Sequence, residues 1–253
     1  MTGSLVLLRH GQSTWNALNL FTGWHDVPLS PIGVIEAQQA GVTMRQAGLH
    51  FDAAHTSLLS RVIETSRLAL HELGQDDLLV RRDWRLNERH YGSLQGLDKR
   101  RVTALYGAEQ TELWRRSFDI APPAIETSNP EHPLNDPIYI KLVAEGFDPE
   151  LLPATECLKD VLARVVPFFE EIVAPQLADN LDVLVTGHGN SLRGLFMHLD
   201  GISADEIAKI SIPTGVPRLY TFDTHRNVSA VNYLGDPEKI AAATRSVSEQ
   251  SAL

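Results

Sequence analysis

Two short apolar runs, each followed by a histidine, constrain what this chain can fold into. Residues 5–8 (Leu-Val-Leu-Leu) lie just before His10, and residues 182–186 (Asp-Val-Leu-Val-Thr) lie just before His188. Short apolar runs bounded by polar and turn-forming residues are typical of buried strands. Because open α/β sheets bind their ligands at the carboxyl ends of strands, we expect both histidines to face one crevice there.

Helical patterns alternate with these strands along the chain. Ser30 followed by Pro31 predicts a helix start, and apolar residues at helical spacing predict a helix from Ser60 to Leu73 that ends at Gly74. Strand–helix alternation with short turns predicts an α/β fold of three layers, α/β/α, with a mostly parallel central sheet. Further strands are expected over residues 51–56, 78–84, 218–222 and 228–234, and the last two would form a hairpin or edge pair. Further helices are expected over residues 98–106, 109–116 and 158–172, and the last of these would bend at Pro167.

The length of 253 residues suits one large α/β domain or two small ones. We expect a single domain over residues 1–253, because both flanks of its least regular segment have the pattern of one fold. That segment, residues 117–155, contains seven of the 14 prolines and shows little periodicity. Since long irregular segments inside a domain are often functional, we interpret this Pro-rich excursion as a lid or rim. After residue 235 we expect a flexible tail, helical over residues 238–243 and frayed beyond.

Composition narrows the function classes. The formal net charge of −10 argues against general affinity for nucleic acids or acidic membranes, although a pocket with a few arginines still binds anions. Cys157 is the only cysteine, which excludes an intrachain disulfide and favours a cytoplasmic location. The longest apolar run near the start is too short for a signal peptide or a membrane span, so we expect no export.

The residue types near the two strand ends suit phosphoryl chemistry. Histidine is a nucleophile toward phosphorus, and arginine provides a planar fork that matches phosphate oxygens. We expect Arg9 and Arg61 to flank the two histidines and to bind a phosphoryl group of about −1.5 to −2 charges. The guanidinium groups disfavour protonation of His10, whereas a bound phosphate favours a protonated His188 that donates a hydrogen bond. The hypothesis is that His10 becomes phosphorylated.

Proton transfer to and from a substrate hydroxyl needs a further group. Glu88 is the candidate general acid and base, because it interrupts an arginine-rich stretch after a predicted strand. The alternative is that Glu88 forms an ordinary ion pair with Arg85 or Arg89, since ion pairs are common in proteins. Position alone favours the ion pair, and both interpretations stay open here.

The candidate residues resemble a known family. Residues 9–11 (Arg-His-Gly), Arg61, Glu88 and His188 resemble the pattern of the histidine phosphatase superfamily, whose fold is also called phosphoglycerate mutase-like. Longer motifs are similar to those of the 2,3-bisphosphoglycerate-dependent phosphoglycerate mutases: residues 21–24 (Phe-Thr-Gly-Trp), 86–92 (Leu-Asn-Glu-Arg-His-Tyr-Gly), 114–116 (Trp-Arg-Arg), 187–193 (Gly-His-Gly-Asn-Ser-Leu-Arg) and 212–217 (Ile-Pro-Thr-Gly-Val-Pro). The resemblance covers residues 5–234 and is weakest over residues 117–153.

The resemblance implies roles for individual residues. It assigns the phosphorylated histidine to His10, the acid–base role to Glu88 and a transition-state role to His188. Arg9 and Arg61 complete the phosphate pocket. Further residues fall where the family contacts phosphate and the rest of the substrate: Ser13, Asn16, Thr22, Gly23, Arg89, His90, Tyr91, Lys99, Arg115, Arg116, Gly189 and Asn190.

The reaction that the resemblance implies is the interconversion of 3-phosphoglycerate and 2-phosphoglycerate in glycolysis and gluconeogenesis. Phosphorylated His10 donates to the substrate hydroxyl, 2,3-bisphosphoglycerate forms and reorients, and the other phosphate returns to His10. The implied priming donor is 2,3-bisphosphoglycerate, and no metal is expected because arginines supply the charge. The family also implies small-molecule phosphoglycerates as partners and a homodimer or homotetramer.

Two rival enzymes share the implied fold. In a phosphatase, water takes the phosphoryl group, but the motifs at residues 21–24, 89–92 and 114–116 favour a closed pocket that retains an intermediate. In a bisphosphoglycerate mutase, glycine is frequent at the position of Ser13, so serine weighs against that enzyme. The chain departs from the family's pattern at Gln12, at Arg100-Arg101 and near residues 131–149. The two arginines form either a solvated helix face or extra electrostatic steering.

A nucleotide-binding or metal-dependent protein would belong to a different class. Residues 187–189 (Gly-His-Gly) begin like a dinucleotide loop, but Leu192 occupies the place of the third glycine. The sequence contains no His-Glu-x-x-His motif and no Cys/His ligand pair. A catalytically inactive binding protein is a further alternative, although no pocket residue of the family is obviously missing.

Overall fold

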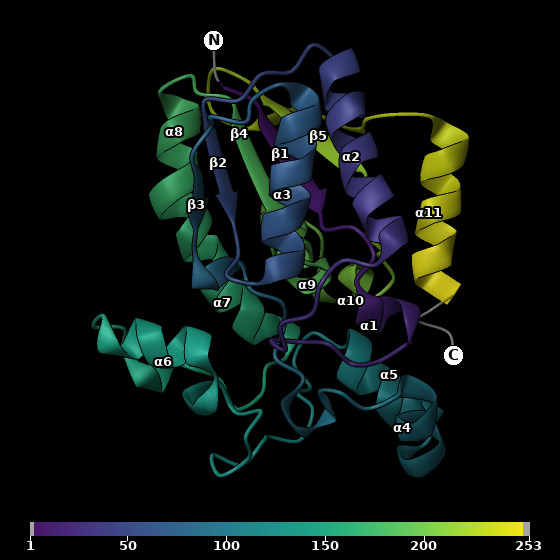
Figure 1. Ribbon diagram of the computed structural model, residues 1–253. Helices are drawn as coiled ribbons and strands as arrows, with labels where there is room; N and C mark the ends of the chain where they lie inside the picture. Colours follow the sequence, from purple (N-terminus) through teal and green to yellow (C-terminus); the bar gives the residue numbers. More distant parts are fainter. Residues whose placement is uncertain (1–2, 250–253) are drawn as a thin grey trace.

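The central sheet carries the strand ends on which the sequence predictions depend. The computed structural model describes residues 3–249, and six strands of this part form one sheet in the order β3-β2-β4-β1-β5-β6 (Figure 1). The strands are β1 (Leu5–Arg9), β2 (Ala53–Thr56), β3 (Val80–Arg82), β4 (Val183–Gly187), β5 (Pro217–Phe222) and β6 (Val228–Tyr233). Strands β1 to β4 pair in parallel, whereas β5 pairs antiparallel with both β1 and β6. The predicted mostly parallel sheet is confirmed, with β5 as its antiparallel strand.

Helices cover both faces of the sheet, which confirms the three-layer architecture (Figure 1). Helices α2 (Pro31–Gln46) and α3 (Ser60–Leu73) lie on one face, and α7 (Leu158–Phe168) and α9 (Gly189–Asp200) lie on the other. Along β1, Val6 and Leu8 pack on the α2–α3 side, whereas Leu5 and Leu7 pack on the α7–α9 side. Because successive side chains of a strand point to opposite faces, the whole apolar run is buried.

The pairing of β1 with β4 places the two candidate histidines next to each other. The strands are in parallel register, with Arg9 opposite Gly187. The N–H of His10 donates to the Gly187 carbonyl oxygen (3.0 Å), so the pairing extends to the residue before His188. The predicted crevice at the carboxyl ends of the strands follows from this register.

The loop after β1 packs tightly onto the start of α2. Ser30 caps this helix by accepting a hydrogen bond from the Gly33 N–H, and Pro31 occupies the first helical position, as predicted. A Cβ atom on residue 11 would lie 2.2 Å from the Gly33 carbonyl oxygen, so only glycine fits at Gly11. This contact fixes the backbone that follows His10.

The remaining elements agree with the predicted pattern in part. Helix α3 has the predicted bounds and ends at Gly74 in the left-handed region (φ 84°). Helices α4 (Lys99–Tyr106) and α5 (Ala108–Arg116) match the prediction, and the π-helical turn η5 (Phe169–Val173) follows the expected bend. Short elements not predicted are α1 (Thr14–Ala17), η1 (Trp84–Leu86), η2 (Gly92–Leu94), α8 (Ala174–Ala178) and α10 (Ala204–Ile207). Among residues 3–249, none of the helices combines the length and the apolar character that a membrane span requires.

The C-terminal helix is longer than the sequence pattern predicts. Helix α11 runs over Pro237–Glu249 rather than residues 238–243, and it lies at the edge of the molecule (Figure 1). Residues 250–253, the end of the tail that we expected to be frayed, lie outside the described part of the chain.

The Pro-rich excursion, residues 117–155, is less irregular than predicted. It contains helix α6 (Pro137–Ala144) and the 3₁₀ turns η3 (Pro133–Asn135) and η4 (Pro149–Leu151). Each of the three begins with a proline, because the fixed φ of proline suits a first helical position, where its missing N–H costs nothing. Tyr139 and Leu152 of this segment pack with Trp24, so the excursion adjoins the site end of the sheet.

Replacement of a sheet residue tests the two-sided core. Leu7 is 1 % exposed on the α7–α9 side. We expect Leu7→Ala to lower the free energy of unfolding by about 2–5 kcal/mol, since it removes buried methyl groups and leaves a cavity. Leu79→Ala is the control, because Leu79 is 72 % exposed and its loss should cost less than ~0.5 kcal/mol. Urea denaturation followed by circular dichroism measures both, and equal costs would contradict the assigned core.

Candidate active site

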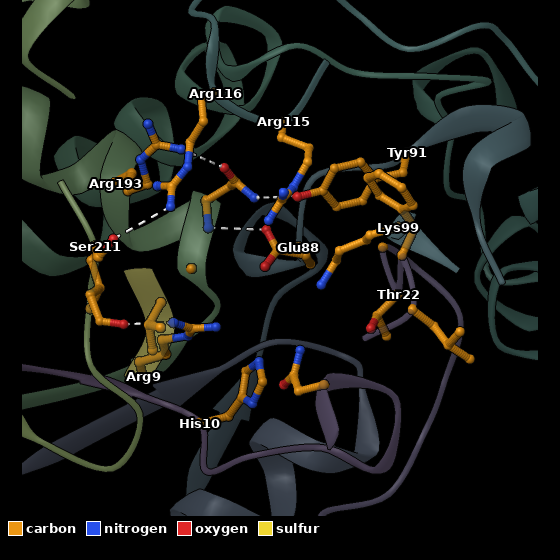
Figure 2. A pocket seen from close by; sticks show the side chains of 18 of the residues that line it. Arg9, His10, Thr22, Glu88, Tyr91, Lys99, Arg115, Arg116, Arg193 and Ser211 are labelled. Carbon is orange, nitrogen blue, oxygen red and sulfur yellow. Dashed lines mark hydrogen bonds between the residues drawn. The ribbon is translucent and has the colours of Figure 1, made fainter. Parts of the chain in front are cut away.

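Most of the candidate residues meet in one cavity at the carboxyl ends of β1 and β4 (Figure 2). Those that line it are Arg9, His10, Asn16, Thr22, Gly23, Arg61, Glu88, Tyr91, Lys99, Arg115, Arg116, Gly189 and Asn190. They come from distant segments, including the loop after β1, the first turn of α3, the loop after η1 and the start of α9. The fold therefore assembles a cationic cavity within a chain of net negative charge.

Ser13, Arg89, His90 and His188 stand in the wall behind the cavity surface. Ser13 caps helix α1. The guanidinium carbon of Arg89 lies 4.6 Å from the ring centre of Tyr91. His90 accepts a hydrogen bond from a backbone N–H two residues further on (3.0 Å), and burial lowers its pKa to about 3. The positions of Ser13, Arg89 and His90 suit side chains that hold the cavity wall in place.

His10 is poised as a neutral nucleophile. Its Nδ1 lies 2.6 Å from the carbonyl oxygen of Gly11, and because a carbonyl only accepts, Nδ1 carries the proton. Nε2 therefore keeps its lone pair, and the described residues give it no hydrogen-bond partner. Burial, together with the guanidinium groups of Arg61 and Arg9, holds the pKa of His10 well below 6.5. The neutral state agrees with the sequence-based expectation, with burial as the larger cause.

His188 stands beside His10 and is also neutral in the absence of a ligand. The two ring centres are 5.0 Å apart, at an interplanar angle of 67°. Burial, followed by the Arg61 guanidinium and His10, holds the pKa of His188 well below 6.5. The chain alone thus gives both histidines the same protonation state rather than the opposite states that we expected. That a bound phosphate protonates His188 stays a prediction.

Backbone carbonyls hold the two arginines of the phosphate pocket. Arg9 donates from Nη1 to a carbonyl of the loop before β5 (2.6 Å), and its buried Nε has no partner among residues 3–249. Arg61 donates to the carbonyls of His25 (3.0 Å) and Gly23 (2.8 Å). Burial lowers the pKa of Arg61 to about 10, so this arginine still keeps its positive charge at neutral pH. Each guanidinium retains N–H groups for a phosphate.

Glu88 lies at the centre of the cavity (Figure 2). Its Oε1 accepts hydrogen bonds from the backbone N–H groups of Arg89 (2.8 Å) and Asn190 (3.0 Å). Its backbone carbonyl accepts from Trp24 Nε1 (2.5 Å) and from Arg164 Nη2 (2.9 Å). Since Oε1 is occupied, Oε2 is the oxygen available to exchange a proton with a ligand.

The ion-pair alternative for Glu88 is not supported. Arg85 pairs with Asp83 (2.8 Å) and Glu171 (2.7 Å) instead. The guanidinium of Arg89 donates to a backbone carbonyl of α5 (2.7 Å). Within residues 3–249, no side-chain cation lies within ion-pair distance of Glu88.

A second group of cations lines the cavity away from His10 (Figure 2). Lys99 of α4 and Arg115 and Arg116 of α5 make up this group. Burial, with Arg115 and Arg9 close by, lowers the pKa of Lys99 to about 7. The cavity therefore offers positive charge at two places, which suits a ligand with more than one anionic group.

Sequence reasoning missed several residues of the cavity wall: Leu20, Phe21, Arg193, Ile210, Ser211, Ile212 and Val247. Arg193 follows Asn190 by three residues in α9 and donates to its Oδ1 (3.1 Å). Helical spacing within the motif at residues 187–193 is the signal that could have identified it. Burial, with Arg116 and Arg89 nearby, lowers the pKa of Arg193 to about 9. Among residues 3–249, no group of three or more His, Cys, Asp or Glu side chains is arranged to hold a metal ion.

A family model covers most of the chain. The model of the histidine phosphatase superfamily (branch 1) matches residues 5–131 and 139–234. The chain therefore belongs to the histidine phosphatase superfamily.

Similarity to curated relatives narrows the family. The chain is 49 % identical over 250 residues to a 2,3-bisphosphoglycerate-dependent phosphoglycerate mutase of Xylella fastidiosa (strain 9a5c), covering 99 % of this chain and 98 % of the relative. A protein of the same name from Nitratidesulfovibrio vulgaris (strain DP4) is 48 % identical, covering 98 % of each chain. Within the superfamily, the chain belongs to the family of the 2,3-bisphosphoglycerate-dependent phosphoglycerate mutases.

Solved structures support the fold. The alpha-ribazole phosphatase from Shigella flexneri superposes with a TM-score of 0.66 at 21 % identity, covering 92 % of this chain and 96 % of that one. A mycobacterial glucosyl-3-phosphoglycerate phosphatase superposes with a TM-score of 0.65 at 21 % identity, covering 92 % of this chain and 97 % of that one. At this identity the likeness shows the shared architecture alone.

The lowered pKa of Lys99 predicts that anion binding takes up a proton. Near pH 7 the free cavity holds Lys99 partly neutral, and a bound dianion favours its ammonium form. Raising the pH from 7 to 9 should weaken sulfate binding, by up to about tenfold per pH unit above the pKa. Sulfate keeps its charge over this range, so thermal-unfolding shifts at graded sulfate concentrations report the affinity.

Lys99→Met should flatten this pH dependence. Lys141→Met is the control, because Lys141 is an exposed lysine beside Glu145 (3.8 Å) and should leave the dependence unchanged. A wild-type affinity that stays constant from pH 7 to 9 would contradict the lowered pKa.

Proposed function

We propose that this chain interconverts 3-phosphoglycerate and 2-phosphoglycerate through a phosphorylated His10, with 2,3-bisphosphoglycerate as priming donor. The names of the relatives at 48–49 % identity support the bisphosphoglycerate dependence. One observation carries the proposal: His10, with its lone pair on Nε2, stands on one side of a cavity that has further cations on the other side (Figure 2).

Phosphorylation of the chain begins at His10 Nε2. When bound, 2,3-bisphosphoglycerate supplies the phosphoryl group that primes this nitrogen. An N–P bond forms at Nε2, a P–O bond of the donor breaks, and the proton stays on Nδ1, which donates it in a hydrogen bond to the Gly11 carbonyl oxygen. Arg9 and Arg61 offset the charge on the transferring group, and protonated Glu88 gives its proton to the leaving oxygen.

Return of the phosphoryl group reverses these roles. Glu88, now a carboxylate, removes the proton of the attacking substrate hydroxyl as that oxygen bonds to phosphorus. The N–P bond breaks, and Nε2 of His10 regains its lone pair. Because two backbone amides hold Oε1, Oε2 is the oxygen that we assign to the proton. The same carboxyl group thus serves as acid in one half-reaction and as base in the other.

The cations away from His10 distinguish a mutase from a phosphatase. A mutase has to retain a ligand that carries a carboxylate and two phosphates while this ligand reorients in the cavity. Lys99, Arg115 and Arg116 provide charge for the groups that are not at His10. A phosphatase has no need to retain a bisphosphorylated ligand, so this second cationic group favours the mutase.

Further parts of the proposal follow from the family resemblance. We infer a homodimer or homotetramer, a cytoplasmic location, and a reaction that proceeds without a metal ion because arginines supply the charge. Activity that survives a strong chelator would support the last point, and size-exclusion chromatography with light scattering measures the oligomeric state.

Removal of His10 tests the phosphohistidine. We expect His10→Ala to lose acid-labile labelling by 32P-labelled 2,3-bisphosphoglycerate and to lose isomerisation in an enolase-coupled assay with 3-phosphoglycerate. His71→Ala is the control, because His71 is an exposed histidine paired with Asp76 and should keep both signals. Retention of the label by His10→Ala would overturn the assignment. Fast release of inorganic phosphate by the wild-type chain without isomerisation would favour a phosphatase instead.

Replacement of Glu88 tests proton transfer separately. In Glu88→Gln, an amide oxygen can still accept the two backbone hydrogen bonds, but the group no longer exchanges a proton. We expect kcat to fall by about 10²–10⁴-fold while the thermal unfolding temperature changes little. Glu171→Gln, at the exposed partner of Arg85, is the matched control and should keep full activity. A Glu88→Gln variant with wild-type kcat would assign the proton transfer to another group.

A further inference from the structure

Ser57 contacts one ring nitrogen of His188. Ser57 directly follows β2, and its Oγ lies 2.9 Å from His188 Nε2. The same Oγ accepts a hydrogen bond from the Leu59 N–H (3.2 Å). Both side chains are fully buried, with 0 % exposure. The other ring nitrogen of His188, Nδ1, is buried without a partner among the described residues.

Counting the hydrogen atoms of this contact decides its direction. The Leu59 N–H occupies one lone pair of Ser57 Oγ, and His188 Nε2 is the other described partner of that oxygen. If Nε2–H donated to Oγ, the buried serine hydroxyl hydrogen would lack an acceptor, and the buried Nδ1 lone pair would lack a donor. If the hydroxyl donates to Nε2, only the Nδ1–H lacks a partner. The second arrangement leaves fewer buried groups unpaired and is favoured.

A phosphoryl group would supply the acceptor that the Nδ1–H lacks in the second arrangement. The His188 ring lies 5.0 Å from the His10 ring, beside the place where a phosphoryl group on His10 would lie. An Nδ1–H there finds an oxygen acceptor, whereas an Nδ1 lone pair would face the negative oxygens. We propose that Ser57 is a positioning residue that fixes the proton of neutral His188 on Nδ1, so that His188 donates a hydrogen bond to the phosphoryl group. This inference rests on the proposed phosphoryl transfer.

The fixed tautomer lets His188 donate a hydrogen bond without carrying a positive charge. Burial disfavours protonation of His188, and so do the surrounding groups, which are Arg61 of α3, His10 just after β1, Arg164 of α7 and Arg9 at the end of β1. If His188 could donate only as an imidazolium, its protonation would have to overcome the effects of burial and of these groups. A neutral Nδ1–H donor does not, because the serine sets the tautomer without adding charge.

Nuclear magnetic resonance measures the tautomer directly. We would label the full chain with 15N-histidine and record long-range 1H–15N spectra, which separate the Nδ1–H, Nε2–H and doubly protonated forms. The His188 signals are assigned by their absence in His188→Gln. We expect wild-type His188 to show the Nδ1–H form. His55, whose Nε2 lies 2.9 Å from Gln176 Oε1, serves as an internal reference for the Nε2–H form.

Two serine variants separate positioning from packing. Ser57→Ala should move His188 toward the Nε2–H form and lower kcat about tenfold to a hundredfold, with KM little changed. Ser57→Thr keeps the hydroxyl and should restore both the tautomer and most of kcat. Ser66→Ala is the matched control, because Ser66 is a buried serine whose hydroxyl donates to a carbonyl of its own helix (3.1 Å). It should leave the His188 tautomer unchanged.

The outcomes distinguish this inference from the proposed function. Wild-type His188 in the Nε2–H form, or a Ser57→Ala variant that loses kcat without a change of tautomer, would overturn the role of Ser57. If Ser57→Ala fails to fold, the wild-type spectrum and Ser57→Thr still decide the question. A chain with the Nδ1–H form that neither becomes phosphorylated nor isomerises phosphoglycerate would overturn the proposed function and leave the tautomer assignment standing.

Discussion

The parallel pairing of β1 with β4 is the interaction on which the site depends. The hydrogen bond from the His10 N–H to the Gly187 carbonyl (3.0 Å) is the last step of this pairing and places His188 directly beside it. Side chains alternate along a strand, so a slip of one residue would turn Leu7 to the opposite core and rotate His10 away from the cavity. Burial of both sheet faces makes such a slip costly, and the core therefore fixes the geometry of the two candidate histidines.

The way in which the cavity arginines are held explains how a chain of net negative charge binds anions. Arg9, Arg61 and Arg193 each donate to backbone carbonyls, and within the described residues none has a carboxylate within ion-pair distance. Arg164, just outside the cavity lining, instead forms a buried ion pair with Glu156 (2.7 Å). Carbonyls orient a guanidinium without cancelling its charge, so the charge remains for the ligand. Burial lowers the pKa of Arg9, Arg61 and Arg193, which is the cost of this arrangement.

Local sequence signals predicted the elements whose formation depends on residues close together in the chain. Apolar runs predicted β1 and β4, and capping residues with helical spacing predicted α3 to the residue. Helix α6 was missed because residues 117–155 show little periodicity and contain seven prolines, although Pro137 occupies a first helical position. Motif resemblance identified most of the cavity residues, but Arg193 and Ser57 were missed because each acts through a single side-chain contact. The ion-pair alternative for Glu88 was decided only by the structure, in which Arg85 pairs with Asp83 and Glu171 and the Arg89 guanidinium donates to a backbone carbonyl of α5.

The Pro-rich excursion also takes part in placing Glu88, the candidate acid–base group. Trp24 donates to the Glu88 carbonyl, and Tyr139 of the excursion packs against its ring at 4.8 Å. Just after the excursion, Glu156 binds Arg164, which donates to the same carbonyl. Both contacts fix the backbone from which the carboxyl group projects, so the segment has a role beyond covering the cavity. A short connector in its place would remove the packing on Trp24 and loosen one of the two donors, and the angle at which Glu88 meets a ligand would no longer be set from two sides.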